Sequence, residues 1–210
     1  MPSTKLLNIE KWLNTSLQGL AFWIGHRRSL FSDYPLPEGA LVAEACNLLQ
    51  ANLPDKLVLS PECLYRNIVP QVRGSRGKEN DDRSRADLVI CRKDDKLERK
   101  EGNISKHVEY VIEVKRASAP KKDIENDLIR LRNCLQNFSG GARPRALLFV
   151  VSESGAPKRF VDVKTGKAKR RKKKMPDGDG YYRVRRAIKA SASFAVESKA
   201  HYVCILEILL

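Results

Sequence analysis

Three residues in the middle of the chain have the types and spacing that metal or phosphoryl chemistry requires, namely Asp87, Glu113 and Lys115. Glu113 and Lys115 are two positions apart in the apolar segment 109–116, so in a strand their side chains lie on one face. A carboxylate and an ammonium group at the end of an apolar strand are costly to bury unless they have partners or a function. We therefore take these three residues as the candidate site.

A hairpin explains how Asp87 reaches Glu113. The charged separator Arg92–His107 is centred near Lys100, and a turn there sets the register of the two flanking strands. The register pairs Leu88 with Ile112 and Ile90 with Tyr110. Two carboxylates then lie side by side and repel each other unless a cation lies between them, and such oxygen ligands suit Mg²⁺ or Mn²⁺. Lys115 would lie next to the metal, where its charge can orient a water molecule or offset charge on a phosphate.

A helix predicted at Glu38–Leu53 carries a further acidic candidate. Glu44 is three residues after Leu41 and four before Leu48, so it falls on the apolar face and needs a partner, for which Lys115 or the metal is suitable. The alternative is that Glu44 lies at the margin of the apolar stripe and faces solvent. Glu38, at the start of the helix, is explained by the helix dipole.

The elements around these residues indicate an α/β fold, with a mixed central β-sheet flanked by helices. We expect one domain over residues 1–210, with a helical extension at 1–37, a core at 38–152, and C-terminal strands at 153–210 that include a basic arm at 164–180. Arg145–Ser152 contains six consecutive apolar residues, which predicts a central strand buried on both faces. The other predicted helices are Leu6–Ile24 and Pro120–Phe138; the other predicted strands are Leu57–Leu59, Leu64–Val69, Ala86–Cys91, Glu109–Arg116, Phe160–Val163, Tyr181–Ala187 and His201–Leu209.

This arrangement resembles the PD-(D/E)xK nuclease superfamily, which has the restriction-endonuclease-like fold. The matching residues are Ala86-Asp87, Glu113-Val114-Lys115 and Glu44 on the preceding helix, and the order helix–strands–helix–strand over 38–152 is also similar. Ala86 stands where the name-giving proline would be. The resemblance implies that Asp87 and Glu113 bind the metal with the backbone carbonyl of Val114, that Lys115 is the catalytic lysine, and that Glu44 is the helix carboxylate.

The resemblance further implies a magnesium-dependent endonuclease or exonuclease, with a bacterial or phage-related role in restriction, repair or defence. The charge of the chain agrees with a polyanionic partner, because 40 Lys and Arg against 25 Asp and Glu leave a net charge of +15. We expect this partner to be double-stranded DNA. A homodimer or a larger complex is compatible with the sequence.

Basic residues concentrate in Lys167–Lys174, where seven of eight residues are Lys or Arg. We expect a mobile protrusion between two strands that contacts phosphates, with Met175 as its one apolar residue. A solvated loop and a nuclear-import signal are the alternatives. The expected nucleic-acid contacts are Lys167, Lys169, Arg170, Arg171, Lys172, Lys173, Lys174, Tyr182, Arg183, Arg185 and Arg186, with tyrosine available for stacking.

Several classes are disfavoured. The five cysteines are scattered, which argues for a reducing compartment, and we expect a cytoplasmic protein with no signal peptide and no membrane span. The three histidines are isolated, which disfavours a histidine-based nuclease. No phosphate-binding loop motif occurs, so nothing in the sequence indicates ATP hydrolysis. Three alternatives to a nuclease remain: a surface ladder of salt bridges at the candidate site, a non-catalytic nucleic-acid-binding protein of the same fold, and an adaptor protein that binds RNA through its basic loop.

Overall fold

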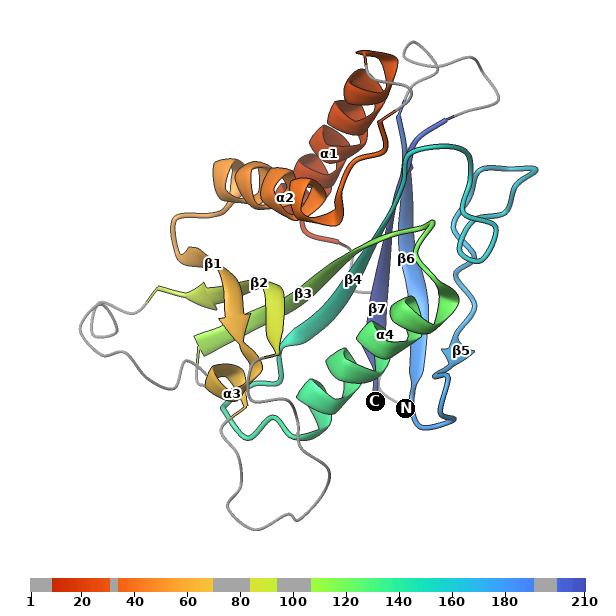
Figure 1. The fold of residues 1–210 in the computed structure, drawn as a ribbon. Coiled ribbons are helices and arrows are strands. Elements are labelled where there is room, and N and C mark those ends of the chain that lie inside the picture. The colour runs from red at the N-terminus through yellow and green to blue at the C-terminus, as the bar shows by residue number, and fades with distance from the viewer. Residues whose placement is uncertain (1–8, 31–33, 70–83, 94–106, 191–199) are drawn as a thin grey trace.

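The strands form one mixed sheet, drawn in Figure 1 from a computed structural model that describes residues 9–30, 34–69, 84–93, 107–190 and 200–210. The helices are α1 (Lys11–Leu30), α2 (Glu38–Asn52), α3 (Tyr65–Ile68) and α4 (Lys121–Gln136); the strands are β1 (Leu57–Leu64), β2 (Arg85–Arg92), β3 (Val108–Arg116), β4 (Arg145–Ser152), β5 (Lys173–Lys174), β6 (Tyr181–Lys189) and β7 (Tyr202–Leu209). Their order across the sheet is β1-β2-β3-β4-β7-β6-β5. The predicted α/β class with a mixed central sheet is confirmed.

The first four strands show the predicted pairing. β1, β2 and β3 are antiparallel neighbours, and β4 is parallel to β3, because the chain crosses over through α4 between them. The pairs Leu88–Ile112 and Ile90–Tyr110 are both present, so the hairpin register is confirmed. The predicted turn near Lys100 lies outside the described residues, as does the polar segment Arg73–Asp82.

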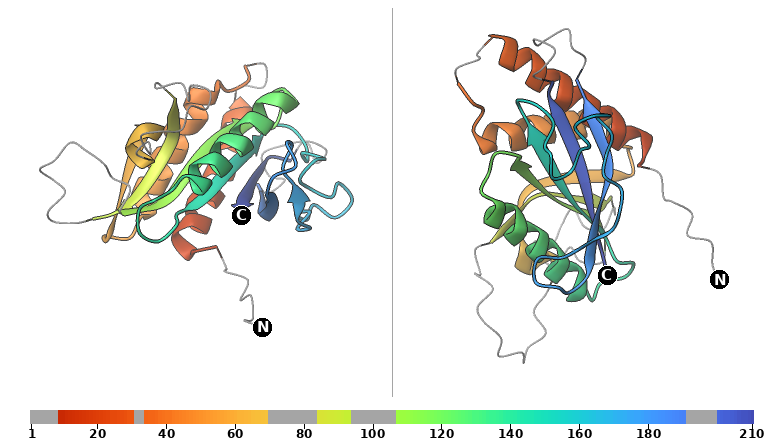
Figure 2. Two further views of the ribbon diagram at one scale, coloured as in Figure 1. Left: turned by 90° about the horizontal axis from the view of Figure 1, so that it is seen from below. Right: turned by 90° about the vertical axis from the view of Figure 1, so that its right-hand side faces the viewer.

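Helices cover both faces of the twisted sheet (Figures 1 and 2). α4 packs on one face with its apolar stripe, and α1 and α2 pack on the other. β4 is buried on both sides as predicted, because Leu148 and Val150 face α4 while Leu147 and Phe149 face α1 and α2. The apolar stripe of α4 consists of Ile124, Leu128, Leu131 and Leu135, all of them buried.

Two strand predictions are wrong. Leu64–Val69 forms the end of β1 and the short helix α3, because the chain turns after Leu64 and Val69 N–H bonds back to the Tyr65 carbonyl. Phe160–Val163 lies in a turn, with only a single bridge between Val161 and Ala168.

The prediction of a free basic protrusion is also wrong. Phe160 (1% exposed), Val161 (0%) and Met175 (3%) are all buried in the core beneath α4. β5 then pairs with β6 at the outer edge of the sheet, Lys173 opposite Tyr182. The segment is therefore anchored on the sheet, and its basic side chains lie on a docked turn.

Within the described residues, no helix is both long and apolar enough to cross a membrane.

Candidate active site

Asp87 lies where the ladder between β2 and β3 ends. The last paired residues are Leu88 and Ile112, and beyond them the Asp87 carboxylate replaces the backbone, accepting a 2.7 Å hydrogen bond from the Val114 N–H. The N–H and C=O of one strand residue point to the same side. The Val114 carbonyl is therefore directed toward the β2 side as well, where Asp87 lies. The predicted proximity of Asp87 to the Glu113-Val114-Lys115 segment is present.

Glu113 is almost fully buried, with 3% of its surface exposed. Its Oε1 accepts a 2.6 Å hydrogen bond from the Tyr65 hydroxyl and lies 3.4 Å from Nη1 of Arg130. Burial, with the neighbouring Asp87 carboxylate next in importance, raises the pKa of Glu113 to about 8, although the Tyr65 hydrogen bond opposes the rise. Burial also raises the pKa of Asp87. Near neutral pH Glu113 therefore holds a proton for much of the time unless a cation takes its place.

Lys115 is held between two carboxylates. Its Nζ donates a 2.6 Å hydrogen bond to Oε1 of Glu38 and lies 3.2 Å from Oδ2 of Asp127. Burial opposes the charge of the ammonium, but these two carboxylates outweigh burial and raise the pKa of Lys115. Lys115 therefore stays protonated, and it can donate hydrogen bonds or offset negative charge but cannot act as a base at neutral pH.

Asp127 and Arg130 of α4 complete this group, and the sequence analysis missed both. Asp127 is 3% exposed and forms a 3.0 Å ion pair with Arg130. A signal for Asp127 was present, since it lies three residues after Ile124 and four before Leu131, inside the apolar stripe of the helix. We name the group formed by Glu38, Asp87, Glu113, Lys115, Asp127 and Arg130 the strand-end cluster.

Glu44 is not part of this cluster. Lys115 takes Glu38 as its α2 partner, and among the described residues no hydrogen bond or ion pair joins Glu44 to Lys115. Each helix residue advances the side chain by about 100°, which places Glu44 beside Leu48 on the flank of α2 that meets α1 at Gly19. The assignment of Glu44 to the site is therefore wrong, and the dipole explanation of Glu38 is incomplete.

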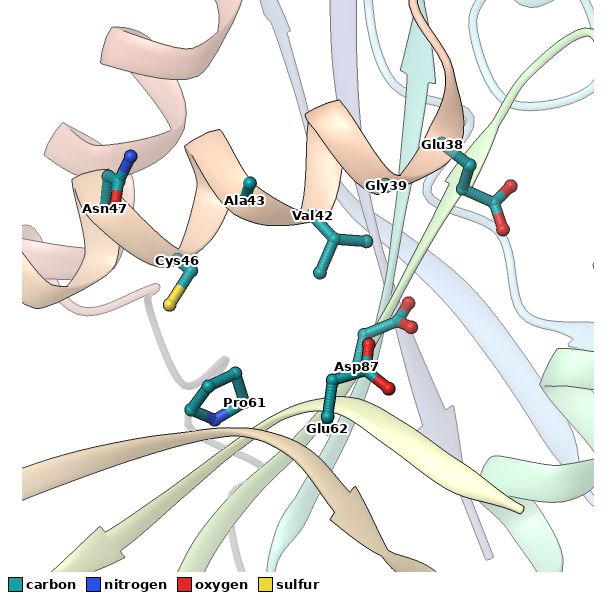
Figure 3. Close-up of a pocket in the computed structure, with 9 residues that line it drawn as sticks. All are labelled: Glu38, Gly39, Val42, Ala43, Cys46, Asn47, Pro61, Glu62 and Asp87. Atoms are coloured by element: carbon teal, nitrogen blue, oxygen red, sulfur yellow. The ribbon is translucent and has the colours of Figure 1, made fainter. Parts of the chain in front are cut away.

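A groove between α2 and β1 ends at the cluster (Figure 3). Its volume is about 550 Å³. Val42 and Cys46 point into it from α2, Pro61 faces them from β1, and Asp87 lies at one end (Figure 3). The remaining lining residues are Glu38, Gly39, Ala43, Asn47 and Glu62.

The donor set of the cluster fits a hard divalent ion. Asp87 and Glu113 offer carboxylate oxygens, and the Val114 carbonyl is directed to the same side. Burial, and after it the nearby Asp87 carboxylate, raises the pKa of Glu113, so a cation bound beside it would favour its charged form. Within the described residues, no group of three or more His, Cys, Asp or Glu side chains has a geometry suited to one ion. Protein ligands for Mg²⁺ would therefore be two carboxylates and a backbone oxygen, with water completing the shell.

The residues predicted to contact nucleic acid divide into four groups, of which Arg183 and Arg185 form the last. Lys173 is half-buried, with its Nζ donating a 2.7 Å hydrogen bond to the Arg159 carbonyl. Tyr182 is 3% exposed, so its ring belongs to the core and offers no face to a base. The residues that remain exposed are Lys167, Lys169, Arg170, Arg171, Lys172, Lys174 and Arg186.

Arg183 and Arg185 turn toward a buried carboxylate. Nε of Arg185 lies 2.7 Å and Nη2 of Arg183 lies 3.4 Å from Oε2 of Glu207, while Nε of Arg145 lies 3.0 Å from its Oε1. Nη1 of Arg145 also pairs with Glu10 at 2.8 Å. We name these five residues the Glu207 cluster. The prediction that Arg183 and Arg185 bind phosphates overlooked this carboxylate.

Comparisons with protein-family models, curated proteins and solved structures found no match to this chain.

Proposed function

We propose that this protein is a metal-dependent nuclease that hydrolyses phosphodiester bonds, with DNA as its substrate. The observation that carries the proposal is the register of β2 and β3, which brings Asp87 to Glu113 and leaves Lys115 beside them. Apart from the short helix α3, the order α2-β1-α3-β2-β3-α4-β4 also agrees with the helix–strands–helix–strand order of the PD-(D/E)xK resemblance. Both features come from the backbone and were expected from the sequence.

Asp87, Glu113 and the Val114 carbonyl would hold Mg²⁺ or Mn²⁺. A divalent ion bound there would polarise the scissile phosphate and lower the pKa of a coordinated water molecule. The chain supplies the geometry, since Asp87 is fixed by the Val114 N–H and Glu113 by the Tyr65 hydroxyl. These bonds keep both carboxylates in place before the substrate arrives, so little ordering remains to be done during the reaction.

Lys115 acts as a donor in this proposal. Because Glu38 and Asp127 hold it protonated, its ammonium can orient the attacking water molecule or stabilise negative charge on the phosphate. The side chain of Arg130 is 40% exposed, and its contact with Glu113 is long, with 3.4 Å between Nη1 and Oε1. It can therefore turn to a phosphate oxygen when a metal ion takes over the neutralisation of Glu113.

Cleavage of circular single-stranded DNA, and of supercoiled plasmid, whose underwinding opens short unpaired stretches, tests the proposal. We expect nicking or linearisation with Mg²⁺ or Mn²⁺ and none with EDTA. Lys115→Ala is the matched control for a contaminating nuclease, because it leaves the chain able to bind a metal ion and should remove the activity. A preparation that cuts equally well with this substitution would contradict the proposal.

A non-catalytic nucleic-acid-binding protein is the second candidate, and one observation favours it. Lys115 and Arg130 already neutralise part of the negative charge of the cluster without a metal ion. Exposed basic side chains along the docked turn 167–174 can contact phosphates. Replacing the seven basic residues of this turn with Ser should weaken binding to all DNA sequences alike, because phosphate contacts carry no sequence information. The slope of log K against log salt should become shallower by about 0.9 per lost phosphate contact on duplex DNA. Binding with that salt dependence but without metal-dependent cleavage would favour this candidate.

A further inference from the structure

The groove between α2 and β1 has walls of a different character from its end. Val42, Ala43, Cys46 and Pro61 make the walls largely apolar, and Asn47 adds one amide that can both donate and accept hydrogen bonds. Its nine described lining residues include no cation. A phosphate therefore has no partner along the walls, whereas an uncharged, flat, partly polar group has apolar contacts and one amide.

The end of the groove is acidic. Asp87 and Glu38 line it, and Glu62 lies opposite Asp87, because Pro61 pairs with Leu88 and Cys63 with Ala86 on either side of them. These carboxylates repel a phosphate unless a metal ion intervenes. A nucleotide held by its phosphate at this end would thus place its phosphate at the carboxylates and its sugar and base along the apolar walls.

We propose that this groove binds the nucleoside next to the scissile phosphate, and that the substrate strand is unpaired at that nucleotide. This inference rests on the proposed nuclease function and adds the substrate class to it: single-stranded DNA, or the unpaired end or flap of a duplex.

The size of the groove is the reason for the unpaired strand. A volume of about 550 Å³ lies within the range of pockets that enclose one small molecule. One wall is helix α2 and the other is the edge strand β1, so a base seated between them has protein on both sides (Figure 3). A complementary base and its backbone would occupy the space of these walls. Enzymes that hold a base between protein walls act on single strands or take the base out of the duplex.

Obstructing the groove tests the inference. Ala43 is exposed at the rim of the groove, so Ala43→Phe places a ring at the mouth of the groove without disturbing the core. Ala51→Phe is the matched control, since Ala51 is exposed on the same helix outside the groove. We expect Ala43→Phe to slow cleavage of a single-stranded oligonucleotide about 10- to 100-fold, as misplacement of a substrate does. Ala51→Phe should stay within about twofold of the unsubstituted protein.

Cys46 gives a readout that does not depend on cleavage. Its thiol faces the groove, whereas Cys63 is also half-buried but does not line it. In the Lys115→Ala variant with Mg²⁺, a single-stranded oligonucleotide should slow alkylation of Cys46 by iodoacetamide several-fold and leave Cys63 unchanged, as followed by peptide mass spectrometry. A blunt duplex of the same sequence should protect Cys46 much less.

The two proposals fail in different ways. No metal-dependent cleavage of any DNA would contradict the nuclease function, while protection of Cys46 would still show that the groove binds an unpaired strand. Equal cleavage of single strands and duplex interiors, with Ala43→Phe as active as Ala51→Phe, would overturn the groove inference and leave the nuclease function standing. Cleavage of single strands and flaps that Ala43→Phe impairs would support both.

Discussion

Two clusters of charged side chains lie at different places on the same sheet, and their balance of charge differs. Glu113 of the strand-end cluster shares its face with Val111 beneath α4, whereas Glu207 of the other cluster shares its face with Ile205 beneath α1. In the strand-end cluster the carboxylates are Glu38, Asp87, Glu113 and Asp127 and the cations are Lys115 and Arg130. In the Glu207 cluster the carboxylates are Glu10 and Glu207 and the cations are Arg145, Arg183 and Arg185.

The net charge of each cluster distinguishes the candidate site from the structural cluster around Glu207. Carboxylates in excess leave room for a movable cation. Burial, with Asp87 next, raises the pKa of Glu113 to about 8, although Arg130 opposes the rise. In the other cluster three guanidinium groups contact one buried carboxylate, and these cations are part of the chain. Buried charge by itself therefore does not indicate function. The candidate site is distinguished by uncompensated negative charge at the end of a groove.

The largest expected effect follows from substitutions at the metal-binding carboxylates. Asp87→Asn and Glu113→Gln keep the size of each side chain and remove the charge that holds the ion, and Lys115→Ala removes the donor beside it. Each should lower the rate of plasmid cleavage at least about 1,000-fold, equivalent to about 4 kcal/mol of transition-state stabilisation. Circular dichroism should show the fold retained. If Glu207→Gln lowered the cleavage rate per folded molecule to the same extent, the conclusion that only the strand-end cluster takes part in cleavage would be contradicted.

Substitution of Glu207 should act on stability instead. Glu207→Gln leaves three arginines around a neutral amide, and removing one partner of a buried charge group costs about 3–5 kcal/mol in the free energy of unfolding. Urea titration should show this as a lower midpoint with an unchanged slope. A loss below about 0.5 kcal/mol would mean that the arginines find other partners or solvent.

The pH dependence of stability sharpens the contrast. Glu113 has its pKa raised from 4.5 to about 8 in the folded protein, so the fold binds a proton more tightly than the unfolded chain does. The stability this gives is fully present below pH 4.5 and is lost as the pH rises through about 8. Burial raises the pKa of Asp87 and of Asp127 as well, which adds to the change with the same sign. Unfolding free energy without metal should therefore fall by a few kcal/mol across this window, and Glu113→Gln should flatten the fall.

Magnesium should reverse this trend, because metal ligands must be deprotonated. The increase in Tm on adding Mg²⁺ should be larger at pH 8 than at pH 6 in the unsubstituted protein. Asp87→Asn should abolish the increase at both pH values. An increase that is equal at the two pH values would show that Glu113 is not a ligand.

The strand part of the site followed from the sequence because it depends on local rules. The alternation of side chains fixed the shared face of Glu113 and Lys115, and the centre of the polar separator gave the pairing of Leu88 with Ile112. Once this register is set, Asp87 and Glu113 must be neighbours. The Val114 N–H bond to Asp87 is then a consequence of the ladder ending at Leu88.

The helix part of the site depends on tertiary packing and was predicted poorly. An apolar stripe says which side of a helix is buried but not how far along the sheet the helix lies. Asp127 had the same sequence signal as Glu44. The packing of α4 nevertheless brings the Asp127 carboxylate to Lys115, whereas the packing of α2 does not bring Glu44 there. The prediction of a basic protrusion was wrong for a related reason. Phe160 and Val161, which anchor the segment on the core, lie outside the basic run Lys167–Lys174 from which the prediction was made.

The smallest expected effect compares two glutamates of α2. Glu38→Gln replaces the charged acceptor of the shorter contact of Lys115, at 2.6 Å, with a neutral amide and so weakens it, and it leaves Asp127 in place at 3.2 Å. The ammonium should keep its charge but lose its position, so cleavage should slow about 10-fold while the affinity for metal changes little. Glu44→Gln should be silent, within about 0.5 kcal/mol in stability and about twofold in rate.

This pair of substitutions distinguishes position on the helix from charge, since each removes one carboxylate from α2. A slower rate in both variants to the same degree would mean that α2 contributes only its overall negative charge. A slower rate in Glu44→Gln alone would restore the original assignment and require α2 to turn by about 120° from the orientation seen here, since six residues separate the two side chains. The buried positions of Leu41, Ala45 and Leu49 oppose such a turn, because it would carry all three out of the core.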